Sequence, residues 1–146
     1  MDEDQVFELV KGCKHLKFIF RGVFSATNFP LDFQANKFII VNTAKSDSPG
    51  IHWVFIAKKD RNNVLFFADP LGFPAETYFN IIKELSAHND YQLFDLMKNK
   101  QPLQSLNSQL CGLFCIYIAH FFVKLNSNVF PQIDELSLIN FVKHMS

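Results

Sequence analysis

The stretch Leu110-Cys-Gly-Leu-Phe-Cys-Ile-Tyr-Ile-Ala-His-Phe-Phe-Val-Lys-Leu125 is apolar at nearly every position. An amphipathic surface helix has polar residues on one side, whereas a helix that is apolar all round is buried. The run from Leu110 to Val123 is also shorter than the roughly 20 residues that a membrane-spanning helix needs, and it contains His120. We therefore expect a central buried helix at 110–125, around which the rest of a soluble chain packs.

Upstream of this helix, three segments have the β-branched and aromatic residues typical of strands. They are Lys37–Asn42, Ile51–Ala57 and Val64–Ala68. The polar turn at 60–63 predicts that the last two form a hairpin. Helical spacing predicts three helices, at Gln5–Val10, Ala75–His88 and Asp134–His144. A further strand is predicted at Tyr91–Met97, and Lys17–Phe24 is expected to be a strand or an extended segment. Helices around a mixed or antiparallel sheet define an α+β fold.

Composition limits the kinds of function that the chain can have. At 146 residues, with 49% apolar residues, it is expected to be one globular domain covering 1–146. Fourteen basic and fourteen acidic side chains cancel, so no overall field draws it to nucleic acid or to an anionic membrane. A basic cluster at Lys58, Lys59 and Arg61 is interpreted as a solvated turn. The three cysteines form no regular disulfide framework, and the acidic N-terminus is unlike a secretory signal, so we expect an intracellular, reducing compartment.

Cys111 stands where the buried helix begins, directly before Gly112. The helix dipole and the free amides at that position stabilise a thiolate, which makes Cys111 a candidate nucleophile. Gly112 would leave room for a substrate backbone. Cys115 lies one turn further into the apolar helix, where a thiol behaves as a small hydrophobe. Position alone leaves open whether both cysteines are simply core residues.

His52 and Asp69 are expected at the same end of the two hairpin strands. A carboxylate placed there could hold the imidazole of His52 and fix its tautomer, as in nucleophile–base–acid triads. Taken singly, His52 could be structural and Asp69 could be a turn residue. A side-chain amide near Cys111 could stabilise a tetrahedral oxyanion, and by composition Gln101, Gln104 and Gln109 are equal candidates. No metal site is predicted, because an apolar helix carrying Cys111, Cys115 and His120 lacks the polar surroundings that zinc sites have.

Three segments in order resemble the adenovirus endopeptidase family, which is related to the SUMO-specific proteases. Ile40-Val-Asn-Thr-Ala44 with Gly50-Ile-His-Trp53 is similar to the stretch that leads to the family's catalytic His-Trp. Phe67-Ala-Asp-Pro-Leu-Gly-Phe73 is similar to its acidic-Pro-Phe-Gly-Phe segment. Gln104-Ser105, Asn107-Ser108 and Cys111-Gly-Leu-Phe-Cys115 are similar to its oxyanion glutamine and nucleophile region.

The resemblance implies a papain-like cysteine peptidase with Cys111 as nucleophile, His52 as base, Asp69 as orienting acid and Gln104 as oxyanion donor. It also implies that Trp53 shields the catalytic pair from water. The implied activity is cleavage of viral capsid and core precursors during virion maturation, in the virion and the infected cell. The alternatives are a ubiquitin- or SUMO-directed isopeptidase and an inactive interaction module.

Some features depart from the family pattern. The adenovirus enzyme has Glu where this chain has Asp69, although the SUMO proteases have Asp. The adenovirus enzyme is strongly basic and uses DNA as a cofactor, whereas this chain has no net charge, so stimulation by DNA is not expected. No cysteine lies between Cys13 and Cys111, so the family's covalent link to an activating viral peptide is absent, and peptide activation would be non-covalent. No cofactor is otherwise expected, and a monomer is expected.

Overall fold

The structure is a computed structural model, which describes residues 2–43, 52–59, 63–87, 91–105 and 108–145. In this part of the chain, five strands form one mixed sheet in the order β1-β2-β3-β4-β5. The strands are β1 (Phe20–Ser25), β2 (Lys37–Asn42), β3 (Trp53–Lys58), β4 (Val64–Ala68) and β5 (Gln92–Asp95). β3 is antiparallel to β2 and β4, whereas the two edge strands run parallel to their neighbours. The predicted hairpin is β3–β4, and the predicted α+β class is confirmed.

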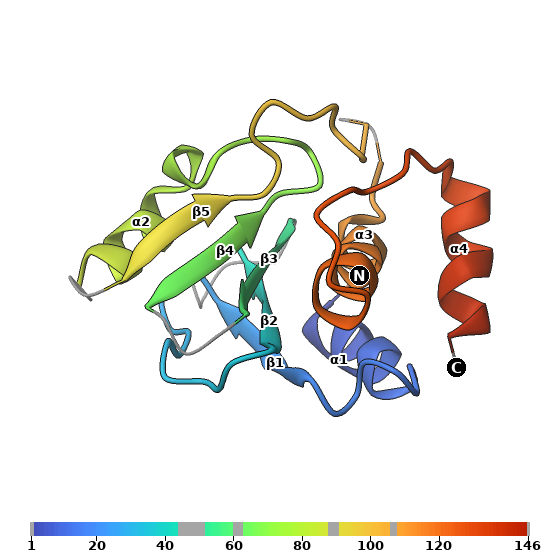
Figure 1. Ribbon diagram of the computed structural model, residues 1–146, viewed down its shortest axis with the longest axis horizontal. Helices are drawn as coiled ribbons and strands as arrows, with labels where there is room; N and C mark the ends of the chain where they lie inside the picture. Colours follow the sequence, from blue (N-terminus) through green and yellow to red (C-terminus); the bar gives the residue numbers. More distant parts are fainter. Residues whose placement is uncertain (1, 44–51, 60–62, 88–90, 106–107, 146) are drawn as a thin grey trace.

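The helices lie on both faces of this sheet (Figure 1). Those on one side are α1 (Glu3–Lys11), α3 (Cys111–Ala119) and α4 (Glu135–His144), and α2 (Phe79–Ser86) is on the other. Alternation along the strands supplies both faces, since Phe38 and Ile40 of β2 point to the α3 side while Ile39 and Val41 point to the α2 side. No helix among the described residues is long and apolar enough to span a bilayer.

The buried helix differs from the prediction in its second half. All nine residues of α3 are buried, as expected, but from His120 to Lys124 the backbone continues as a π-helical turn. The helix therefore changes its winding at His120, whose buried Nδ1 atom has no hydrogen-bond partner among the described residues. π-turns of this kind are single insertions within α-helices.

The predicted helix at Ala75–His88 is divided into two parts. A 3-10 turn, η1, covers Ala75–Thr77, Tyr78 is extended with φ −108° and ψ 97°, and α2 then begins at Phe79. His88 lies outside the described residues. The break places the side chain of Tyr78 near the carboxyl end of β4, beside Asp69.

The interpretation of Lys58 as part of a solvated turn is wrong. Lys58 ends β3 and is 7% exposed. Its Nζ donates to the carbonyl oxygens of Leu31 and Phe33, the latter at 2.9 Å, and to the hydroxyl of Tyr91 at 3.2 Å. Because a buried ammonium group needs acceptors, these contacts fasten the 31–33 segment and Tyr91 to the end of the sheet. Arg61 lies outside the described residues.

Candidate active site

The site lies where β3 and β4 approach the N-terminus of α3. His52 directly precedes β3, Asp69 directly follows β4, and Cys111 is the first residue of α3. His52 was expected inside a strand, but the strand begins one residue later, at Trp53. The hairpin brings His52 and Asp69 together across seventeen positions of sequence.

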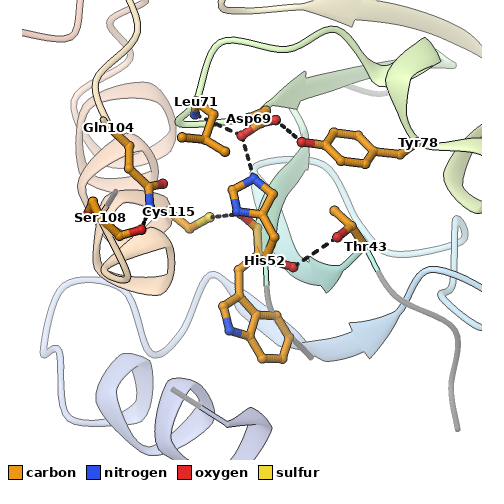
Figure 2. Close-up of polar contacts among 9 residues, drawn as sticks. Thr43, His52, Asp69, Leu71, Tyr78, Gln104, Ser108 and Cys115 are labelled. Atoms are coloured by element: carbon orange, nitrogen blue, oxygen red, sulfur yellow. Dashed lines mark hydrogen bonds and ion pairs between the residues drawn. The ribbon is translucent and has the colours of Figure 1, made fainter. Parts of the chain in front are cut away.

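Asp69 holds the imidazole of His52 by its Nε2 atom. The distance from His52 Nε2 to Asp69 Oδ1 is 2.7 Å, and Figure 2 shows the ring directed at the carboxylate. The Asp69 side chain is fully buried, whereas the His52 side chain is 12% exposed. Since Nε2 is occupied by the carboxylate, Nδ1 is the ring nitrogen left to interact with a thiol.

The environment of His52 favours its protonated form. Burial acts to lower the pKa of His52, but the hydrogen bond to Asp69, a hydrogen bond with the Cys111 side chain and the charges of both groups outweigh it. Together they raise the pKa from its ordinary 6.5 to about 9. Such a shift is expected when hydrogen bonds and neighbouring groups favour the protonated imidazole. His52 therefore carries its proton at neutral pH.

The two helical cysteines differ in their surroundings. Cys111 is 4% exposed at the helix start, next to the buried Gly112, whereas Cys115 is completely buried. Burial raises the pKa of the Cys115 thiol well above its ordinary value, with the charges of Cys111 and Asp69 adding to the effect. Its Sγ lies 3.5 Å from the Trp53 carbonyl oxygen, to which it donates. Cys115 is thus the core thiol that its position indicated.

Gln104 is the buried member of the three candidate glutamines. It is 5% exposed, whereas Gln101 and Gln109 are both exposed. Its Nε2 donates to the Ser108 carbonyl oxygen at 3.0 Å, which fixes the orientation of the amide. An amide nitrogen has two hydrogens, so one remains for another acceptor. The backbone N–H of Gln104 donates to the Pro70 carbonyl oxygen at 2.9 Å, which links this segment to the turn that follows Asp69.

Trp53 follows His52 and is 2% exposed, with its side chain in the core on the α3 face. Among the described residues, no group of three or more His, Cys, Asp or Glu side chains could hold a metal ion.

Sequence reasoning missed one polar contact of this site. The hydroxyl of Tyr78 donates to Asp69 Oδ2, and the backbone N–H of Leu71 donates to Asp69 Oδ1 at 2.9 Å. Tyr78 was counted as an apolar position of a helix. Nothing in its sequence surroundings distinguished it from the other apolar positions of that predicted helix.

A mixed sheet with a cysteine-bearing helix packed against it defines the papain-like class of cysteine peptidase folds. A family model described as adenovirus endoprotease matches residues 20–146, and the chain belongs to this family. The resemblance stated from the three sequence segments is therefore confirmed.

Curated relatives agree with this family assignment. The protease of ovine adenovirus D serotype 7 is 32% identical over 128 residues, which cover 81% of this chain and 63% of that protein. The protease of bovine adenovirus 7 is 31% identical over 101 residues, or 64% of this chain and 50% of that protein. The chain thus spans about half to two thirds of the length of these curated relatives. In fold it is similar to the central domain of the uncharacterized Lpg1148 protein from Legionella pneumophila, with a TM-score of 0.51 and 15% identity over 97% of this chain and 86% of that one.

Proposed function

We propose that this chain is a cysteine endopeptidase that cleaves viral capsid and core precursor proteins during virion maturation. The proposed residues are Cys111 as nucleophile, His52 as acid–base, Asp69 as orienting acid and Gln104 as oxyanion donor. The observation that supports this most is the 2.7 Å contact of His52 Nε2 with Asp69 Oδ1, together with the pKa of His52, which Asp69 and Cys111 raise to about 9 against the effect of burial. Family membership supports the kind of substrate.

In the proposed mechanism, the Cys111 thiolate attacks the scissile carbonyl carbon and forms a C–S bond. The second N–H of Gln104 Nε2 and the Cys111 backbone N–H stabilise the oxyanion, an effect of about 2.7–4 kcal/mol per donor. The Nδ1–H of His52 then protonates the leaving amine as the C–N bond breaks. Water attacks the thioester while His52 takes its proton, and cleavage of the C–S bond restores the thiolate.

Several further features belong to the same proposal. Residues 1–146 form one peptidase domain, which acts as a monomer, needs no metal, and works in the virion and in the reducing interior of infected cells. A viral activating peptide binds without a disulfide, because no cysteine lies between Cys13 and Cys111. DNA is not required, because basic and acidic side chains balance.

The test is co-expression of the protein with candidate capsid precursors, followed by mass spectrometry of the new termini. We expect cleavage at Gly-containing sites with the wild-type protein and with Cys115→Ala, and none with Cys111→Ala. Fluorogenic ubiquitin and SUMO C-terminal substrates form a second arm. Cleavage of these in place of the precursors would assign an isopeptidase, and no cleavage of either would support an interaction module.

A further inference from the structure

Tyr78 contacts the candidate triad at Asp69. Its hydroxyl donates to Asp69 Oδ2, while His52 Nε2 lies 2.7 Å from Asp69 Oδ1 (Figure 2). We propose that Tyr78 is a positioning residue, whose hydroxyl holds the Asp69 carboxylate in the rotamer that directs Oδ1 at His52. This inference rests on the proposed function and adds a fourth side chain to that site.

The buried carboxylate needs more than one donor. Asp69 is fully buried, and a carboxylate in such surroundings is costly unless both oxygens accept hydrogen bonds. Oδ1 accepts from His52 and from the Leu71 backbone N–H at 2.9 Å, and Oδ2 accepts from Tyr78. The last bond opposes rotation of the carboxylate about its Cβ–Cγ bond, because any rotation that moves Oδ1 from His52 also takes Oδ2 from Tyr78.

Tyr78 can hold the carboxylate because its own position is fixed. Its backbone N–H donates to the Ala75 carbonyl oxygen at 3.0 Å, and its carbonyl oxygen accepts from the Ile82 N–H at 3.1 Å. Its ring centroid lies 6.5 Å from that of Phe67 in β4 and 6.0 Å from that of His52. The break between η1 and α2 thus places a phenol at a defined point against the triad.

The hydroxyl of Tyr78 also remains protonated, and so remains a donor, over the pH range in which the peptidase is expected to be active. Burial, the hydrogen bond to Asp69 and the charges of Asp69, Cys111 and Cys115 raise the pKa of Tyr78 above its ordinary value of 10. A neutral phenol therefore faces the carboxylate throughout the range in which His52 titrates.

The test is Tyr78→Phe, which removes the hydroxyl and keeps the ring. We expect kcat to fall roughly tenfold with KM unchanged, because Tyr78 acts through Asp69 and touches no substrate. We also expect the alkaline limb of the pH–rate profile to move to lower pH, because a freely rotating carboxylate supports the imidazolium less well. The matched control is Tyr91→Phe, which removes a hydroxyl that donates to the Leu31 carbonyl oxygen at 2.8 Å, away from the site. It should leave kcat and the pH profile unchanged.

A double-mutant cycle with Asp69→Asn separates positioning from general stabilisation. If Tyr78 acts through the carboxylate, Tyr78→Phe costs roughly tenfold in the wild-type background and less than about twofold in the Asp69→Asn background. Equal losses in both backgrounds, or an unchanged rate in wild type, would overturn the inference.

Nuclear magnetic resonance titration of His52 gives a readout that needs no turnover. A lower His52 pKa in Tyr78→Phe than in wild type supports positioning even if the isolated chain cleaves nothing, in which case only the proposed activity fails. An identical His52 pKa in the two proteins refutes the role of Tyr78, whatever the activity.

Discussion

Replacing Asp69 by Asn keeps the shape of the side chain and removes its charge. The Asn oxygen can still accept from His52 and from the Leu71 N–H, which now bond at 2.7 and 2.9 Å. The amide NH₂ then faces Tyr78, whose hydroxyl can accept as well as donate. The fold should therefore survive, while the imidazolium of His52 loses its anionic partner.

The expected loss of rate follows from the loss of this anionic partner. A hydrogen bond to a charged group is worth about 1.5–3 kcal/mol, so kcat/KM should fall roughly 10- to 150-fold. The alkaline limb should move from about pH 9, the pKa of His52, to lower pH by about one to two pH units. The assay is the pH–rate profile with a Gly-containing fluorogenic peptide, repeated with iodoacetamide, whose reaction with Cys111 needs no substrate recognition.

Asp95→Asn is the matched control. Asp95 Oδ1 accepts the Met97 backbone N–H at 3.0 Å, just as Asp69 Oδ1 accepts that of Leu71, but Asp95 lies on the neighbouring strand β5. We expect this control to leave the rate within twofold of wild type. An Asp69→Asn protein with an unmoved alkaline limb and a rate within twofold of wild type would refute the role of Asp69.

The raised pKa of His52 also predicts how the stability of the fold depends on pH. The folded-state pKa of His52 is raised from 6.5 to about 9, so the folded protein binds this proton more tightly than the unfolded chain does. The resulting stabilisation is fully present below about pH 6.5 and is lost as the pH rises through about 9. Urea unfolding should therefore show a free energy of unfolding that falls across this interval in wild type, and less so in Asp69→Asn.

The remaining predictions concern four other side chains. Cys111→Ala should abolish turnover and lower the pKa of His52, while the temperature of thermal unfolding changes little. Cys115→Ala should keep turnover but lower the free energy of unfolding by roughly 1–2 kcal/mol, because it leaves a small cavity beside Trp53. Gln104→Ala should lower kcat about 10²–10³-fold without slowing iodoacetamide labelling of Cys111, and equal slowing of both would argue against an oxyanion role. Lys58→Met should lower the free energy of unfolding in urea by roughly 2–3 kcal/mol, because the carbonyl oxygens of Leu31 and Phe33 lose their donor, while kcat per folded molecule stays the same.

The central strands and the approach of His52 to Asp69 could be predicted because their signals are local or come from hairpin geometry. Lys37–Asn42 and Val64–Ala68 were predicted with the bounds that the structure gives to β2 and β4. The approach of His52 to Asp69 follows from a hairpin with a short turn. Cys111 and Cys115 could be distinguished by their place along the apolar helix.

Other features depend on tertiary contacts that no short window contains. Lys58 was placed in solvent because lysine is rarely buried, and its acceptors come from segments about 25 to 33 positions away. Tyr78 fits a helical period, so nothing local indicated that it would be extended and bonded to Asp69. The π-turn at His120 likewise interrupts a continuous apolar pattern.

Site-resolved alkylation of the native protein tests most directly whether the sulfur of Cys111 is activated by His52. Limited treatment with iodoacetamide at neutral pH is followed by mass spectrometry of Cys13, Cys111 and Cys115, in wild type and in His52→Ala. The account predicts that Cys111 is labelled at least about tenfold faster than Cys13 and Cys115, because burial raises the pKa of both of those thiols. It also predicts that His52→Ala removes this advantage. Labelling of Cys111 at the same rate in both proteins would contradict it.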